Sequence, residues 1–200
     1  MRARGIDWVP EPRARDEAGR EVLGRLEGEV PAYPMPDWVW GDAVLVAAAA
    51  LLRRLHDATL GFERPGARWR LRAHEPAEVI CHNDFAPYNL VFRDRAPVAV
   101  IDFDTASPGP RAWDLAHLAY RLVPVTAPGN PDAPATPETE RNRRLALLCA
   151  HYGAKAAPDA VLAVLPERLA ELRALTLERG LERDATLYEA DARYARERWA

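Results

Sequence analysis

Polar residues that could bind a cation or a phosphate lie at the ends of three short apolar segments. The segments cover residues 79–80, 90–92 and 98–101, and their β-branched and aromatic residues are typical of strands. Carboxylate and amide oxygens are ligands that Mg²⁺ takes in proteins. Held around one loop, these side chains suit a divalent cation and a phosphate better than an apolar core. They are His82, Asn83, Asp84, Asn89, Asp102 and Asp104.

The spacing of these residues narrows the chemistry. His82 stands two positions before Asp84, and Asn89 stands five positions after it, as in the catalytic loop of kinases. Asp102 follows Asn89 by 13 positions in an Ile-Asp-Phe segment, where a kinase places a metal ligand. In phosphoryl transfer, one carboxylate orients the attacking hydroxyl, while a second carboxylate and an amide oxygen hold Mg²⁺. The spacing therefore favours phosphoryl transfer.

The chain resembles the aminoglycoside phosphotransferase and choline kinase-like family of small-molecule kinases. In that family the loop typically reads H-G-D-x-x-x-x-N, the metal strand I-D-F or I-D-W, and the next helix D-L-A. The corresponding stretches here are His82–Asn89, Ile101–Asp104 and Trp113–Ala116. The match is nearest to actinobacterial-type members that carry H-N-D-x-x-P-x-N, some of which are named for toxin immunity.

The resemblance implies an ATP-dependent phosphotransferase that acts on a small-molecule hydroxyl, with ATP and Mg²⁺ as cofactors. It implies Asp84 and His82 as the catalytic residues, with Asp84 as the base. Asn89 and Asp102 would be the Mg²⁺ ligands, and Asp114 would support the site by bracing the loop together with His82. The substrate cannot be named from these motifs.

The fold implied by the resemblance is α+β: a mostly helical, protein kinase-like C-terminal lobe with a remnant of the N-terminal β lobe. Residues 1–40 would form the remnant and the hinge, and residues 41–200 the catalytic lobe. Apolar periodicity and end signals predict helices over 43–60, 111–122, 138–152, 159–179 and 182–199, with a break or kink at Pro166, and a strand over 20–26. His56, on the first helix, is expected to be a hydrogen-bonded structural residue.

Two parts that such kinases use to hold phosphates are not found in this sequence. No glycine-rich loop precedes residue 40, and the single lysine is Lys155. By resemblance we expect an N-terminally truncated lobe. The alternative is a non-catalytic kinase-like binding or immunity-type protein. An uncovered hinge would leave apolar surface in water, which predicts a homo-oligomer or a partner over the hinge.

Three other interpretations of the polar residues are weaker. A metal hydrolase could use His82 and Asp84 with Asp102 and Asp104, but the kinase spacing explains these residues better. A zinc site at Cys81 and His82 has no second spaced pair. The acids could also merely cap strands and turns, because single aspartates after strands are common.

The composition excludes several broad classes. The net charge of −3 gives no basic field for nucleic acid. The longest apolar run is too short for a membrane span, and the first residues do not resemble a signal peptide. The two cysteines, Cys81 and Cys149, are expected to be free thiols in a reducing cytoplasm. Acidic residues of the last helices alternate with arginines, which indicates a solvated face and not a cation site.

Overall fold

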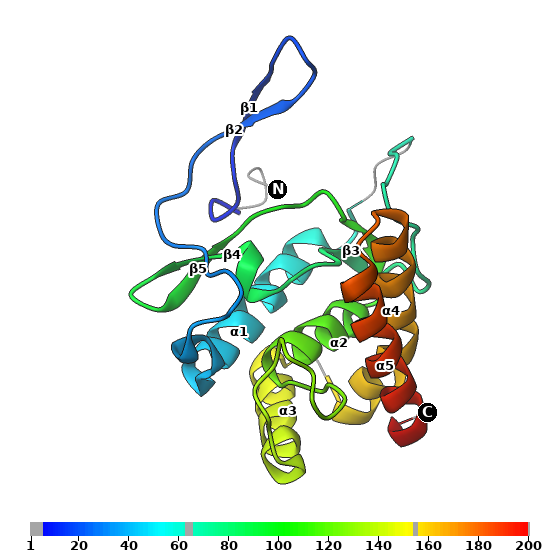
Figure 1. Ribbon diagram of the computed structural model, residues 1–200. Helices are drawn as coiled ribbons and strands as arrows, with labels where there is room; N and C mark the ends of the chain where they lie inside the picture. Colours follow the sequence, from blue (N-terminus) through cyan, green and yellow to red (C-terminus); the bar gives the residue numbers. More distant parts are fainter. Residues whose placement is uncertain (1–5, 63–65, 154–155, 200) are drawn as a thin grey trace.

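Five α-helices form the largest part of the regular structure in the described chain, which comprises residues 6–62, 66–153 and 156–199 of the computed structural model (Figure 1). Figure 1 shows α2 at the centre, with α4 and α5 side by side on one flank and α1 on the other. The fold is α+β, as expected. The helices are α1 (Asp42–Thr59), α2 (Arg111–Leu122), α3 (Glu138–Tyr152), α4 (Pro158–Glu178) and α5 (Glu182–Trp199).

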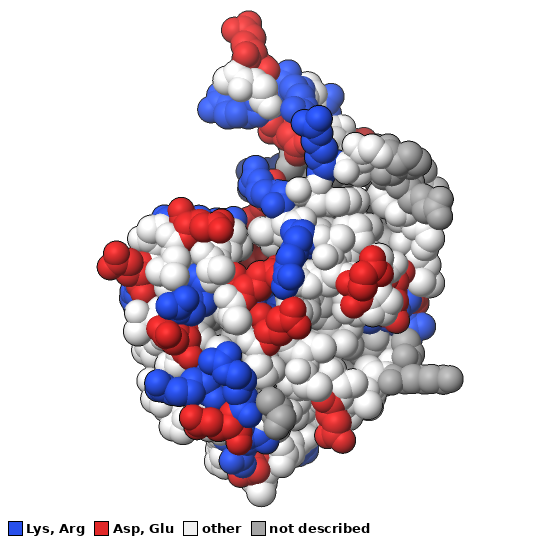
Figure 2. Space-filling view, turned by 90° about the vertical axis from the view of Figure 1, so that its right-hand side faces the viewer, with Lys and Arg blue, Asp and Glu red and all other residues white. Residues whose placement is uncertain are grey.

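Three antiparallel strand pairs accompany the helices in the described residues. β3 (Val79–Cys81) pairs with β6 (Ser107–Gly109), and β4 (Leu90–Arg93) pairs with β5 (Ala96–Val100). These two pairs hold the loop that carries the candidate site. The third pair, β1 (Pro12–Arg15) with β2 (Glu21–Leu23), is an exposed hairpin that stands out from the body in Figures 1 and 2.

The core forms because each helix buries an apolar face against its neighbours. Helix α1 buries Leu45, Leu52 and Leu55, among others, and packs against α3 and β5. Helix α2 is buried along nearly its whole length from Trp113 to Leu122, since α1 and α4 both contact it. This burial of α2 matters for the site, because it takes the polar residues of α2 out of water.

Two local expectations need adjustment. The strand predicted over 20–26 is shorter and covers Glu21–Leu23, the residues that pair with β1. A break into two helices at Pro166 is not seen, since α4 is one helix with the buried Pro166 inside it. Pro166 has no backbone N–H, so α4 lacks one hydrogen bond at this point. The helices expected over 43–60, 111–122, 138–152 and 182–199 are confirmed to within one residue.

The segment after the hairpin is attached to β4. Glu29 N donates to Phe92 O (2.9 Å), and Phe92 N donates to Glu29 O (2.7 Å). Gly28 has φ +143°, and a Cβ there would lie 2.5 Å from both Phe92 O and the Val91 side chain. Only glycine fits such a close approach. The chain then passes Tyr33 and Pro34, which line a cavity together with Asn83 and Asp84.

The surface shows no large field of one sign on the face in Figure 2, where acidic and basic side chains are intermixed. Within the described residues, no helix is both long and apolar enough to cross a membrane. Lys155 lies outside the described residues.

Candidate active site

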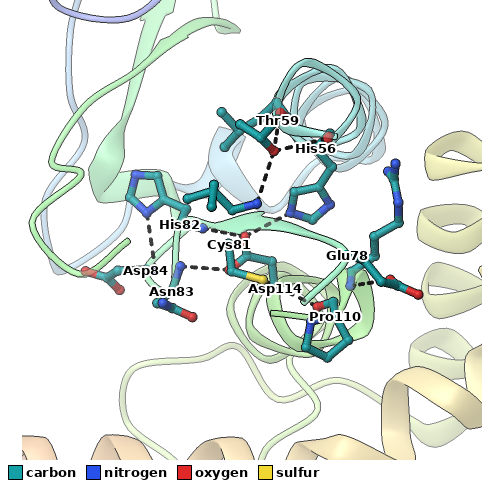
Figure 3. A network of polar contacts seen from close by, with 12 residues as sticks. His56, Thr59, Glu78, Cys81, His82, Asn83, Asp84, Pro110 and Asp114 are labelled. Carbon is teal, nitrogen blue, oxygen red and sulfur yellow. Dashed lines mark hydrogen bonds and ion pairs between the residues drawn. The ribbon is translucent and has the colours of Figure 1, made fainter. Parts of the chain in front are cut away.

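Asp114 ties the loop at residues 82–84 to helix α2 (Figure 3). Its carboxylate accepts hydrogen bonds from His82 N (2.6 Å), Asn83 N (2.8 Å) and His56 Nε2 (3.0 Å). Burial opposes the charged carboxylate, but the hydrogen bond from His56 and those from the backbone donors outweigh it. The pKa of Asp114 therefore lies below its usual value, and the fully buried group stays ionised. A single side chain thus orients two consecutive backbone amides of the loop.

His56 extends this network from α1 to α3. Its Nδ1 accepts from the Tyr152 hydroxyl (2.8 Å), and its Nε2 donates to Asp114. Arg111 donates a second hydrogen bond to the same hydroxyl (2.9 Å). The expectation of a structural, hydrogen-bonded His56 is confirmed.

His82 bridges the loop and the end of β5. Its Nε2 donates to Ile101 O (2.9 Å), and its Nδ1 accepts from Asp84 N (3.3 Å). The ring is fully buried, with both nitrogens engaged. His82 therefore positions Asp84 relative to Ile101, the neighbour of Asp102. Because its ring is fully buried, His82 does not reach a substrate itself.

Asn83 occupies the position at which family members typically have glycine, and the backbone explains why. Its φ is +64°, in the left-handed region that glycine adopts freely and that asparagine tolerates better than most residues. Its Nδ2 donates to Thr105 O (2.8 Å) and Ser107 Oγ (2.7 Å), which fixes the loop to β6. The buried Arg168 of α4 donates to Asn83 O from the other side.

Asp84 is held by several donors while part of it faces a cavity. Tyr88 Oη donates to Oδ1 (2.7 Å), and Asn89 Nδ2 donates to Oδ2 (2.9 Å). His117 Nε2 lies 3.2 Å from Oδ1, without the alignment of a good hydrogen bond. Burial alone would raise the pKa of Asp84, but His117 and Tyr88 outweigh it and hold the pKa far below its usual range. Asp84 is thus an oriented carboxylate, 29% exposed.

His117 is a site residue that the sequence interpretation missed. It follows Asp114 by three positions on α2, so both face the loop from the same side of the helix. That spacing was a usable signal, whereas Arg168 lies 85 positions from Asn83 and gave none. Burial lowers the pKa of His117 from 6.5 to about 4, despite the attraction of Asp84.

Acid is expected to destabilise the fold through His117. The folded protein keeps this ring neutral down to about pH 4, whereas the unfolded chain binds a proton near pH 6.5. The stabilisation is therefore complete above pH 6.5 and is lost progressively as the pH falls towards 4. Urea unfolding at pH 7, 6 and 5 should show a falling free energy of unfolding. The decrease should be smaller in His117→Gln, and identical slopes in the two proteins would contradict this assignment.

The side chains of Asn89 and Asp102 have oxygen atoms that accept no hydrogen bond from the described residues. Because Asn89 Nδ2 is engaged by Asp84, its Oδ1 faces away and accepts no hydrogen bond from the described residues. The exposed Asp102 has φ +60° and no ion pair or hydrogen bond within the described chain. Ile101 N donates to Asn89 O (3.0 Å), so the two candidates are neighbours across the strand pair. An amide and a carboxylate oxygen fit a hard cation such as Mg²⁺.

Asp104 has another partner, although it stands only two residues after Asp102. Arg70 donates to its carboxylate (2.6 Å) in an exposed ion pair. Together with the engaged His82 ring, this removes two of the four ligands that a metal hydrolase would need.

A second group of possible metal ligands is already occupied by hydrogen bonds in this structure. Ligand atoms of His56, Cys81 and Asp114 lie within 4.8 Å of one another. The Asp114 oxygens already accept three hydrogen bonds, and the Cys81 thiol donates to Pro110 O (3.4 Å). Burial raises the pKa of Cys81 well above its usual value, so the thiol is protonated. We interpret the cluster as the brace of the catalytic loop.

The sequence of this chain matches known phosphotransferase and immunity sequences. Residues 66–148 match the model of the phosphotransferase enzyme family. The chain is 40% identical over 110 residues to the trifolitoxin immunity protein of Rhizobium leguminosarum bv. trifolii. That match covers 52% of this chain and 41% of the relative, so the chain spans less than half of that protein.

Solved structures show the same fold. A protein of Ralstonia eutropha JMP134 assigned as an aminoglycoside phosphotransferase has a TM-score of 0.61 at 17% identity, covering 96% of this chain and 80% of its own. The streptomycin–ATP–APH(2″)-IIa ternary complex has a TM-score of 0.53 at 14% identity, with coverages of 92% and 74%. Macrolide 2′-phosphotransferase MphH of Brachybacterium faecium has a TM-score of 0.50 at 15% identity, with coverages of 90% and 73%.

Proposed function

Because residues 66–148 match the model of the phosphotransferase enzyme family, we propose that this chain transfers the terminal phosphoryl group of ATP to a small-molecule hydroxyl. The observation that carries the proposal is the setting of Asp84. Its carboxylate is ionised, oriented by Tyr88 and Asn89, and open to a cavity of about 580 Å³. The acceptor hydroxyl would bind in that cavity and donate its hydrogen bond to Asp84.

The division of roles follows from the contacts. Asp84 orients the hydroxyl and accepts its proton as the phosphoryl group is transferred; because a carboxylate of low pKa is a weak base, its main contribution is to orient the hydroxyl. Asn89 Oδ1 and the Asp102 carboxylate would hold Mg²⁺, which supplies charge neutralisation for the phosphates. His82 and Asp114 keep the loop in register, since each bonds to backbone atoms of residues 82–84 or 101.

Binding of Mg-ATP tests this proposal. Calorimetry on the purified chain should detect Mg-ATP, and Asp102→Asn should weaken its binding at least tenfold, because the change removes the charged ligand. Asp104→Asn is the matched control: it removes an exposed acid two residues away that pairs with Arg70. The control should bind Mg-ATP as the original chain does. Equal affinity in the Asp102 and Asp104 variants would reject the metal assignment.

A second candidate is a non-catalytic immunity-type protein, and the 40% identity to an immunity protein favours it. Such a protein would bind its target with the kinase-like fold and would not need the carboxylate of Asp84. A toxin-protection assay distinguishes the catalytic candidate from the non-catalytic one. Cells that express the chain are exposed to a toxin, and trifolitoxin is the first to test. Protection that survives Asp84→Asn supports binding alone, whereas its loss supports phosphoryl transfer.

The cellular setting and partners are part of the same proposal. Cys81 and Cys149 are both free and buried, which is in keeping with a reducing cytoplasm where ATP is available. Val30 and Tyr33, in the segment that leads to the cavity, are exposed apolar residues. We propose that a second copy or a partner covers this hinge.

A further inference from the structure

The cavity beside Asp84 is lined by groups that select for charge. It lies between the catalytic loop, the Tyr33–Pro34 segment and helices α2, α4 and α5. Four tyrosines line it, together with the basic residues Arg121, Arg179 and Arg183 and the acids Asp84, Asp132 and Asp184. Which of these charges are already neutralised decides what the cavity can bind.

Arg121 is a buried cation in the wall of this cavity, only 9% exposed. Its guanidinium donates to the Tyr188 hydroxyl and lies over the rings of Tyr88 (5.5 Å), Tyr120 (4.9 Å) and Tyr188 (5.5 Å). Its Nε makes no hydrogen bond within the described chain, and no carboxylate there lies within ion-pair distance of it. An arginine stays charged when buried, so this group is a buried cation that forms no ion pair within the described residues.

The acids of the cavity do not neutralise Arg121. Arg183 already pairs with Asp132 (2.9 Å) and Asp184 (3.0 Å). Asp84 is held by Tyr88, Asn89 and His117. The cationic groups of the cavity without an ion pair in the described residues are therefore Arg121 and the exposed Arg179, while Asp84 keeps its own charge because Tyr88, Asn89 and His117 are neutral.

We propose that the cavity takes a hydroxylated small molecule that bears an anionic group, a carboxylate or a phosphate. Arg121 binds the anionic group through the part of its guanidinium that lines the cavity, since its Nε is itself buried, and the tyrosine rings cover the body of the molecule. Asp84 then receives the hydroxyl. Calling the ligand an acceptor rests on the proposed function, whereas the preference for an anion rests on Arg121 alone. A polycationic acceptor would face repulsion from Arg121.

Calorimetry without nucleotide tests the preference on matched compounds. The panel is glycerol, glycerate and glycerol 3-phosphate, and then glucose, glucuronate, glucose 6-phosphate and glucosamine. We expect an anionic member to bind at least tenfold more tightly than its neutral parent, as a charge-assisted contact to a buried arginine provides, and glucosamine to bind weakest. Comparison of the carboxylates with the phosphates identifies the anion. If no anionic member binds better than its parent, the proposal is overturned.

Variants assign the preference to Arg121. Arg121→Gln should remove the tenfold preference, and Arg121→Lys should retain part of it because the charge remains. Arg15→Gln, on the exposed hairpin, removes an equal charge far from the cavity and should change nothing. A preference that persists in Arg121→Gln rejects the assignment. The panel on the unchanged chain decides the proposal even if a variant fails to fold, and because it omits ATP, it separates this inference from a failure of Mg-ATP binding.

Discussion

Asp84→Asn is expected to lower kcat for phosphoryl transfer by about 10²- to 10⁴-fold, the usual contribution of a positioned acid–base group. Asparagine has nearly the same shape, and its oxygen can still accept from the Tyr88 hydroxyl. What is lost is the negative charge that orients the acceptor hydroxyl and receives its proton. Product formation from ATP and an acceptor, measured with KM for both, checks the effect. KM for Mg-ATP should change little, since Asn89 and Asp102 are retained.

Asp104→Asn is again the control for charge at this face, because Asp104 pairs with Arg70 and lies outside the catalytic loop. It should keep the kcat of the original chain. Equal activity of the Asp84 and Asp104 variants would show that the Asp84 carboxylate takes no part in the reaction, and would favour the non-catalytic alternative. Because the pKa of Asp84 is strongly lowered, its protonation should not limit kcat near neutral pH.

Asp114→Ala is expected to lower the free energy of unfolding by about 3–5 kcal/mol, as the loss of one partner from a buried ionic network does. The change leaves His82 N, Asn83 N and His56 Nε2 without their acceptor in a site that water does not reach. Urea unfolding at pH 7 measures the effect. The loop should also lose its orientation, so any phosphotransfer should decrease with it.

Asp57→Ala provides the comparison for an aspartate at the surface. Asp57 pairs with Arg53 (2.7 Å) and Arg111 (2.9 Å) but is partly exposed, so its loss should cost no more than about 1 kcal/mol. A similar small loss for Asp114→Ala would contradict the role of the brace. The pH dependence gives a second check. The folded pKa of Asp114 is lowered, so its stabilisation is present above pH 3.8 and is lost as the pH falls through the folded pKa.

The sequence by itself was sufficient for the features that depend on neighbouring residues. Asp84 and Asn89 are five positions apart in one loop, and such a short separation keeps their side chains close. Asn89 Nδ2 lies 2.9 Å from Asp84 Oδ2. Helical periodicity located α1, α2, α3 and α5 to within one residue, since burial of one face is a local pattern. The resemblance to small-molecule kinases followed from the same short-range motifs, and residues 66–148 match the model of the phosphotransferase enzyme family.

Only the tertiary structure decided which groups surround the loop. Arg168 reaches Asn83, and Arg121 meets the rings of Tyr88 and Tyr188, because α2, α4 and α5 pack together. Asp104 differs from Asp102 because it pairs with Arg70, which lies 34 positions away in the sequence. These contacts join distant segments, and their energies depend on burial, which residue spacing does not report. The proposed charge preference of the cavity therefore depends on how the helices pack, whereas the proposed chemistry of the loop depends on residues that are close together in the sequence.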